Sequence, residues 1–249
     1  MKRSRAAGVV AALLALGTSL ASCGSFASPA DERAETARAF PRADRPVAPI
    51  ISTRWSTEEA RDRVKEADDI MDRAGIAPGM TVADIGAGEG YYTMRLAKRV
   101  GPNGRVLGQD IFGEVIDQLG QRVTRENMSN VSVKLGTPDD PKLPDASFDR
   151  VLMVHMYHEI AEPYAFLWRL HPALKPDGEV IVVDADRPTE QHGTPPALLR
   201  CELEAVGFKY IGMAGKTAAG GYLARFKTGD ARKEPAEIRA CRLSRAPRS

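Results

Sequence analysis

The chain has 249 residues, of which 43% are hydrophobic, 27% charged and 6% aromatic. This composition is sufficient for the core of an α/β domain, and it excludes a wholly disordered chain, a collagen-like repeat and a disulfide-dense miniature scaffold. Cleavage after residue 22 would remove Lys2, Arg3 and Arg5 and change the formal charge from +2 to −1, so the charge balance does not indicate a nucleic-acid partner.

The first 23 residues have the pattern of an export signal. A basic start leads into an apolar run, densest over Val9–Leu16, that is shorter than the about 20 residues needed to span a bilayer. Leu20-Ala21-Ser22-Cys23 resembles the lipobox of bacterial lipoproteins, in which the cysteine carries the lipid. The resemblance implies a signal peptide over 1–22 and a lipid-anchored, periplasmic protein, and Gly24 favours the outer membrane. A plain signal peptide with an incidental Cys23 is the alternative.

Polar sequence without periodicity flanks the central region. Residues 23–53 are rich in Ala, Ser, Arg and acidic residues and contain scattered prolines, which predicts a flexible tether. Residues 228–249 are basic and contain two prolines, which predicts a solvated, flexible tail. Cys201 falls in a predicted helix and Cys241 in this tail, so both are expected to be free thiols, although an oxidising compartment would allow a disulfide.

Residues 54–227 are predicted to alternate between helices and strands. Ser56 to Glu59 has the spacing of a capping box, and one helix with Val64 on its apolar face is predicted to end at Gly75. Buried strands are predicted at 80–85, 105–109, 131–135, 148–154 and 179–184. Helices are predicted up to Arg99 and over 114–126, 163–174 and 196–206, with a closing hairpin of strands at 208–213 and 222–226.

Strands separated by helices of this length predict an α/β fold of the Rossmann-like, doubly wound type. We expect a mostly parallel, seven-stranded sheet with helices on both faces and an antiparallel hairpin at its C-terminal end. In such sheets ligands bind beyond the carboxyl ends of the strands, where the strand order reverses. Functional residues are therefore expected directly after the first four strands.

A glycine-rich turn follows the first strand in the run Asp84-Ile-Gly86-Ala-Gly88-Glu-Gly90. Glycines let the backbone turn sharply and approach a ligand, and the next helix offers unpaired N–H groups at its start. Asp110 ends the second strand, where a carboxylate can accept hydrogen bonds from ribose hydroxyls. A dinucleotide fingerprint needs Gly-x-Gly-x-x-Gly, whereas the third glycine here comes one position early. The spacing favours a nucleoside without phosphates, and a tight turn in an inert domain is the alternative.

These motifs resemble those of the class I S-adenosylmethionine-dependent methyltransferases over roughly Ile76–Phe226. The glycine turn is similar to that family's first motif, and residues 136–144 are similar to its segment after the third strand. Residues 174–182 are similar to its fifth-strand signature, with Asp177 where a glycine is usual. The resemblance implies S-adenosylmethionine as cofactor, held by Asp84, Gly86, Ala87, Gly88, Gly90, Asp110, Ile111 and Asp139 or Asp140.

The run from His155 to Glu159 follows the fourth strand, where the methyl group is expected, and resembles a run in a subgroup of predicted methyltransferases. Methyl transfer is an in-line displacement that depends on positioning, and a neutral histidine can accept a proton near pH 7. His158 is therefore the expected catalytic base, with His155 and Tyr157 as pocket walls or hydrogen-bond partners. Support of the following helix by His158 and Glu159 is the alternative.

No metal site is expected from the sequence. His155 and His158 supply only two ligands, and Glu162 stands where a His-Glu-x-x-His motif needs its second histidine. His171 and His192 are expected at the surface or in turns.

The functional hypothesis is methyl transfer from S-adenosylmethionine to a small-molecule or lipid acceptor by an exported lipoprotein, anchored through Cys23 to the periplasmic side of a membrane. Because the donor is made in the cytoplasm, such an enzyme must obtain it elsewhere. The alternative is a lipoprotein of the same fold that binds or senses a nucleoside-like ligand without turnover. A nicotinamide-dependent oxidoreductase is disfavoured by the glycine spacing.

Overall fold

The computed structural model describes residues 33–50, 57–229 and 231–242, all in the unit that begins at Arg33. The predicted signal peptide and Cys23 lie outside these residues. Within them, no helix is both long and apolar enough to cross a membrane.

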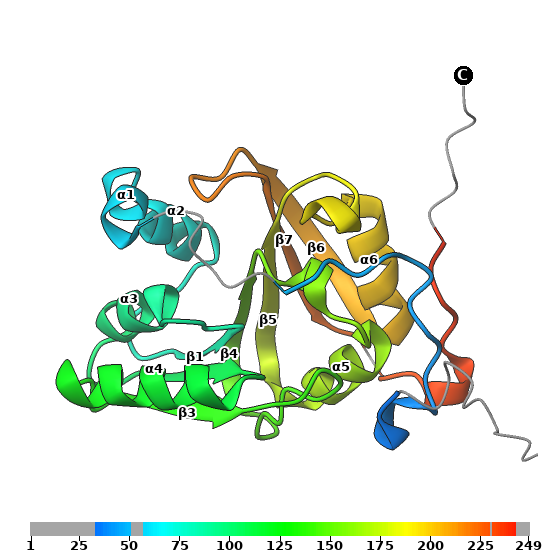
Figure 1. Cartoon of the computed structure of the whole chain (residues 1–249), viewed down its shortest axis with the longest axis horizontal. Coiled ribbons are helices and arrows are strands. Elements are labelled where there is room, and N and C mark those ends of the chain that lie inside the picture. Colours follow the sequence, from blue (N-terminus) through cyan, green and yellow to red (C-terminus); the bar gives the residue numbers. More distant parts are fainter. Residues whose placement is uncertain (1–32, 51–56, 230, 243–249) are drawn as a thin grey trace, which may run out of the picture. The chain divides into compact units, whose positions relative to one another are not determined.

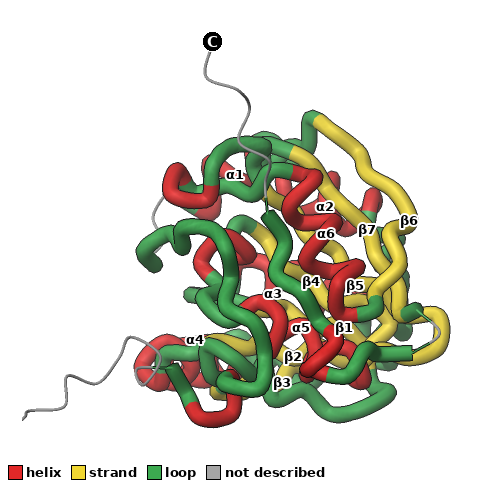
Figure 2. The backbone as a smooth tube through the Cα atoms, turned by 90° about the vertical axis from the view of Figure 1, so that its right-hand side faces the viewer, coloured by secondary structure: helices red, strands yellow, loops and turns green. Residues whose placement is uncertain are grey.

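Seven strands of the described chain form one sheet, in the order β3-β2-β1-β4-β5-β7-β6 (Figure 1). The strands are β1 (Thr81–Ile85), β2 (Arg105–Asp110), β3 (Val131–Leu135), β4 (Phe148–Val154), β5 (Leu174–Asp184), β6 (Phe208–Gly215) and β7 (Tyr222–Thr228). The first five are parallel, whereas β7 runs antiparallel to β5 on one side and to β6 on the other, and β6 forms one edge of the sheet (Figure 2). The predicted fold class is confirmed, and the strand order reverses between β1 and β4.

Helices connect the strands and cover both faces of the sheet. They are α1 (Glu58–Arg63), α2 (Glu66–Arg73), α3 (Tyr91–Val100), α4 (Gly113–Arg125), α5 (Pro163–Leu170) and α6 (Pro196–Val206), with short 3₁₀ turns η1 (Glu35–Ala37), η2 (Tyr157–Glu159), η3 (His171–Ala173), η4 (Thr189–Gln191) and η5 (Pro235–Glu237). Successive strand residues face opposite sides. Val82 therefore packs in the cluster that contains α2 and α3 residues, whereas its neighbour Ala83 packs in the cluster that contains α5 and α6 residues.

The prediction of one helix before Gly75 is wrong. The chain forms α1 and α2 instead, separated at Lys65, whose φ of +53° is left-handed. Val64, expected on the inner face, is 57% exposed. Thr57 caps α1 by accepting a hydrogen bond from the backbone N–H three residues on, and the expected cap Ser56 lies outside the described residues. Gly75 ends α2 with a φ of +64°, as predicted.

Residues 33–50, called the N-terminal segment below, pack on the domain, so the predicted flexible tether is wrong for them. Phe40 is 6% exposed and its ring lies 5.5 Å from that of Trp168. Arg45 forms an ion pair of 2.9 Å with Glu202 of α6, and both side chains are almost completely buried. The segment lacks helical or strand periodicity because isolated side chains, rather than one repeating face, hold it in place.

The predicted flexible tail is also wrong for residues 231–242, the C-terminal segment. The Trp168 indole donates a 2.9 Å hydrogen bond to the Lys233 carbonyl, and Ile238 is 2% exposed. Cys241 forms a disulfide with Cys201 of α6, which corrects the expectation of free thiols. The sequence could not predict this pairing, because Cys241 lies in an irregular segment whose path has no periodic pattern.

Candidate active site

Three glycines shape the turn after β1. The φ values are +67° at Gly86, +54° at Gly88 and +89° at Gly90, in a region of backbone conformation that residues with a Cβ rarely adopt. At Gly90 a larger residue is also excluded by steric overlap, since an added Cβ would lie 2.5 Å from Cδ1 of Leu119. The Ala87 N–H donates a 2.9 Å hydrogen bond to the carbonyl of the residue before Asp110. The turn is thereby fixed beyond the carboxyl ends of β1 and β2.

Asp84 lies beneath this turn and is 3% exposed. Its carboxyl group accepts a 2.5 Å hydrogen bond from the Thr93 hydroxyl of α3. Burial raises the pKa of Asp84 to about 7, and the nearby charge of Asp110 adds to the rise, whereas the Thr93 hydrogen bond and Arg61 oppose it. A cation arriving nearby would favour the ionised form of this carboxyl.

We expect Asp84 to make the free energy of unfolding fall as pH rises from about 4 to about 7. The folded chain keeps this proton up to about pH 7, whereas the unfolded chain loses it near pH 3.9, so the folded state binds more protons in this window. In Asp84→Asn the fall should be smaller by up to about 4 kcal/mol. Urea denaturation of both proteins between pH 4 and pH 8 measures it, and identical pH slopes would contradict a protonated Asp84.

Asp110 bridges the glycine turn and the turn after β2. One oxygen accepts a 3.1 Å hydrogen bond from the Gly88 N–H, and the other accepts from the N–H groups of Ile111 (2.7 Å) and Phe112 (3.2 Å). The residue is 9% exposed. Because a carboxylate offers about four acceptor positions, Asp110 retains the capacity to accept a further hydrogen bond from a ligand.

Asp139 and Asp140 follow β3 in different surroundings. Asp139 is 4% exposed and accepts hydrogen bonds from the Thr36 hydroxyl (2.6 Å), the Thr137 hydroxyl (2.8 Å) and the Arg169 guanidinium (3.1 Å). Burial alone would raise its pKa, but the two hydroxyls and the Arg169 charge hold that pKa below its usual value. Asp140 is half-buried. Asp139 is therefore linked to the N-terminal segment, a contact that the sequence did not predict.

A histidine–aspartate pair lies beyond β4 and β5. Nδ1 of His158 in η2 is 3.1 Å from both carboxylate oxygens of Asp184, the last residue of β5. Asp184 is fully buried and also accepts hydrogen bonds from the Ala185 N–H (2.8 Å) and the Thr194 hydroxyl (2.7 Å). Burial alone would raise the pKa of Asp184, but the neighbouring His155 and His158 side chains hold it at about 2. The carboxylate thus orients His158 with Nε2 turned away from it.

Other polar side chains gather around this pair. Nδ1 of His155 is 3.8 Å from Asp184, whose charge outweighs burial and raises the pKa of His155. Glu159 Oε1 lies 4.0 Å from Nε2 of His158, and the His192 ring stands perpendicular to the His158 ring with centroids 5.5 Å apart. Asp184 was missed from the sequence, although a carboxylate at the end of a predicted parallel strand is a recognisable signal.

Tyr157 is bonded to the core rather than to this cluster, so its predicted role as a pocket wall or hydrogen-bond partner has no support in this structure. It is fully buried, and its hydroxyl donates a 2.7 Å hydrogen bond to Glu202 of α6. Burial and the Glu202 charge raise the pKa of Tyr157 far above its usual value. Tyr157 therefore anchors η2 to the core.

The glycine turn and the histidine cluster are neighbours in space. An added Cβ on Gly86 would lie 3.1 Å from Cγ of Met156, the residue between His155 and Tyr157. A ligand in the turn and a second molecule at the histidines would consequently approach each other.

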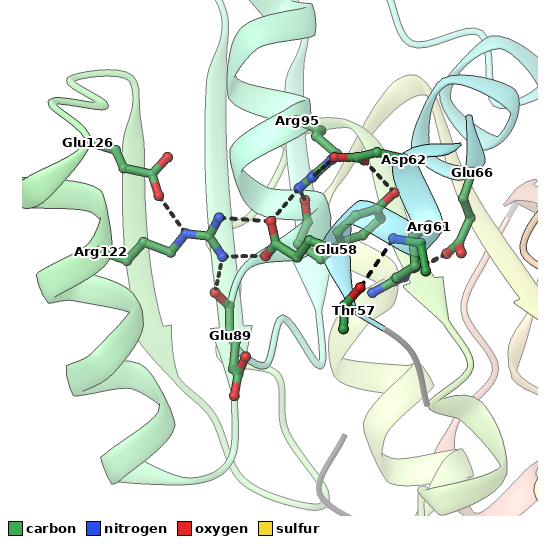
Figure 3. Close-up of polar contacts among 11 residues, drawn as sticks. Thr57, Glu58, Arg61, Asp62, Glu66, Glu89, Arg95, Arg122 and Glu126 are labelled. Atoms are coloured by element: carbon green, nitrogen blue, oxygen red, sulfur yellow. Dashed lines mark hydrogen bonds and ion pairs between the residues drawn. The ribbon is translucent and has the colours of Figure 1, made fainter. Parts of the chain in front are cut away.

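Charged side chains hold α1 beside the glycine turn (Figure 3). Glu58 pairs with Arg122 of α4 at 2.6 Å and with Arg95 of α3 at 3.1 Å, and Arg95 also bonds Asp62 at 2.8 Å. Arg122 donates to the Glu89 carbonyl in the turn itself at 2.8 Å. Since α1 buries no residue, its contacts are ion pairs, the 3.0 Å hydrogen bond from the Tyr91 hydroxyl to Asp62 and the Arg61 guanidinium stacked on the Tyr91 ring.

Comparisons of this chain with protein families, curated relatives and solved structures all identify methyltransferases. Residues 76–216 match the family described as a methyltransferase domain. A demethylmenaquinone methyltransferase of Geobacillus sp. (strain WCH70) is 27% identical over 129 residues, which cover 52% of this chain and 55% of that protein. The chain spans about half the length of the curated relatives it matches.

Two solved structures share the fold. A SAM dependent methyltransferase from Aquifex aeolicus has a TM-score of 0.58 and 22% identity, covering 69% of this chain and 97% of that one. The [4+2]-cyclase SpnF has a TM-score of 0.59 and 17% identity, covering 78% and 91%. At these identities the likeness concerns the fold alone.

Proposed function

The chain belongs to the methyltransferase-domain family, and from this premise we propose that it transfers the methyl group of S-adenosylmethionine to a small-molecule or lipid acceptor. The observation that carries the proposal is the contact between the glycine turn, bridged by Asp110, and the loop that bears His155 and His158. Both stand where the strand order reverses, the place where sheets of this type bind ligands.

The donor site consists of the turn after β1 and the acids after the next two strands. Asp110, with Ile111 beside it, accepts hydrogen bonds from the ribose hydroxyls, and Asp139 or Asp140 binds the adenine amine. Asp84 supports the turn and faces the cationic end of the donor, whose charge would favour ionisation of this carboxyl. The backbone of the turn supplies the close approach, through Gly86, Ala87, Gly88 and Gly90.

His158 acts on the acceptor through Nε2, because Nδ1 faces Asp184. Asp184 is a positioning residue for that ring, and His155 lies beside it as a wall of the acceptor site. The methyl group passes in line from the sulfonium to the acceptor, so much of the rate depends on holding the two molecules in contact.

A lipid-soluble acceptor suits both the quinone-methylating relatives and the predicted anchor. The Geobacillus relative is named for demethylmenaquinone, a quinone. An enzyme anchored through Cys23 would meet such acceptors directly at the membrane surface.

The alternative is a binding or sensing protein that holds the nucleoside without turnover, and the SpnF cyclase shows that this fold is not confined to methyl transfer. Calorimetry with S-adenosylmethionine, its homocysteine product and NAD separates nucleoside binding from dinucleotide binding. Transfer of labelled methyl to a membrane lipid extract then separates the enzyme from the sensor. Tight binding with no labelled product across quinone and phenol acceptors would favour the sensor.

We expect Asp110→Ala to weaken S-adenosylmethionine binding by about 1–3 kcal/mol, roughly 5- to 150-fold, because ribose acceptors are lost and the turn is released from its bridge. Calorimetry measures the change. Asp117→Ala removes an exposed carboxylate from α4 and should leave binding unaltered. An unchanged affinity in Asp110→Ala would remove this residue from the donor site.

We further propose that the protein is an exported lipoprotein on the periplasmic side of a membrane, with the outer membrane favoured. The lipobox around Cys23 motivates this location, and the Cys201–Cys241 disulfide supports it, because disulfides persist in oxidising compartments. Cys23→Ser should move the protein from the membrane to the soluble periplasmic fraction. Fractionation with immunoblotting tests this, and a variant that stays on the membrane would contradict the lipid anchor.

A further inference from the structure

We propose that His158, Glu159 and His192 bind a divalent transition-metal cation of the zinc class. Their ligand atoms all lie within 4.8 Å of one another, and Nε2 of His158 is 4.0 Å from Oε1 of Glu159. In a tetrahedral zinc site with bonds of about 2.1 Å the ligand atoms are about 3.4 Å apart. Small side-chain rotations are therefore enough to bring the three ligands around one ion.

The surroundings of His158 are those of a metal-binding histidine. Such a residue nearly always gives its second ring nitrogen to a carboxylate or carbonyl, which fixes the tautomer and the ring orientation. Here Nδ1 faces Asp184 at 3.1 Å, and Thr194 and the Ala185 N–H hold that carboxylate in turn. Nε2 is thus presented to Glu159 and His192 by a fully buried support.

The two loops that carry the ligands are fixed relative to each other. His158 and Glu159 belong to η2 after β4, whereas His192 follows η4 after β5. The N-terminal segment binds both loops: the Ala48 N–H donates to the His158 carbonyl at 3.1 Å, and the Thr189 hydroxyl donates to the Pro46 carbonyl at 2.8 Å. The ligand set is therefore preorganised rather than assembled by chance at an exposed surface.

The donor set selects the kind of cation. Two imidazoles and one carboxylate suit zinc and its first-row neighbours, whereas Mg²⁺ and Ca²⁺ prefer oxygen ligands alone. Three protein ligands leave a coordination position open, as in catalytic zinc sites. Only the use of that position rests on the proposed function: it would take a hydroxyl oxygen of the acceptor, whose pKa the metal lowers. The hydroxyl proton would then pass to solvent, and the oxygen would bond to the methyl carbon as the bond from that carbon to the sulfonium sulfur breaks. Nε2 of His158 would hold the ion instead of accepting the proton.

Zinc binding by the full chain, purified in detergent and stripped of metal with a chelator, tests the proposal. Competition with a zinc-binding dye should show one tight equivalent of Zn²⁺. His192→Ala and Glu159→Gln should each weaken it at least tenfold, and Glu159→Gln keeps the side-chain size should His192→Ala fail to fold. His171→Ala is the matched control, because His171 packs against the Phe208 ring outside the cluster. Circular dichroism confirms that each variant is folded.

No stoichiometric zinc binding by the wild type, or binding that survives both substitutions in folded protein, would overturn the metal site. The readout uses neither S-adenosylmethionine nor an acceptor, so it separates this inference from the proposed function. Zinc binding in a protein that fails to bind S-adenosylmethionine would remove methyl transfer and leave the metal site. S-adenosylmethionine binding and methyl transfer without zinc binding would remove the metal site and leave the proposed function.

Discussion

Arg45→Met is expected to lower the free energy of unfolding by about 3–5 kcal/mol, because it leaves the Glu202 carboxylate buried without its cation. The side chains of Arg45 and Glu202 are 2% and 0% exposed, and after the substitution Glu202 keeps only the Tyr157 hydroxyl among these partners. Arg45 also donates to the Ile160 carbonyl at 3.2 Å. The loss should therefore loosen both the N-terminal segment and η2, and urea denaturation measures it.

Two further variants make this result specific. Arg200→Met breaks an exposed ion pair with Glu204 on the same helix and should change stability by no more than about 0.5 kcal/mol. Adding Glu202→Gln to Arg45→Met removes the uncompensated charge and should recover more than half of the loss. If Arg45→Met and Arg200→Met lowered the free energy of unfolding equally, the ion pair of the N-terminal segment would stabilise the fold no more than a surface ion pair does.

Replacing both Cys201 and Cys241 by serine is expected to lower the free energy of unfolding by about 4 kcal/mol. The cysteines are 40 residues apart, and a cross-link across a loop of this length restricts the unfolded chain by about that amount. Denaturation of the oxidised wild type and of the double variant gives the difference.

Reduction provides the control for that comparison. Dithiothreitol should bring the wild type close to the double variant and leave the double variant itself unaltered, because only the wild type has a cross-link to lose. A wild type whose stability is insensitive to the reductant would mean that the two thiols are unpaired in solution, and it would withdraw the support that the disulfide gives to export.

The sequence by itself determined the glycine turn and most of the sheet, although β5 starts at Leu174, inside the helix predicted over 163–174. Strands such as β3 and β4 end where they were predicted, because period-2 and buried apolar runs are local signals bounded by turn residues. The positive φ values at Gly86, Gly88 and Gly90 follow equally from local chemistry, since glycine adopts such values more readily than residues with a Cβ. Asp84 and Asp110 could be placed because the carboxyl ends of parallel strands share one edge.

Tertiary structure alone decided the partners of those residues. His192 lies far along the chain from His158, and Asp139 meets Thr36 of a segment without periodicity, so no spacing in the sequence relates them. The same holds for Arg45 with Glu202 and for Cys201 with Cys241. Local periodicity indicates which face of a helix or strand is buried. Which residue that face contacts depends on the path that the irregular segments take over the folded domain, and periodicity does not encode that path.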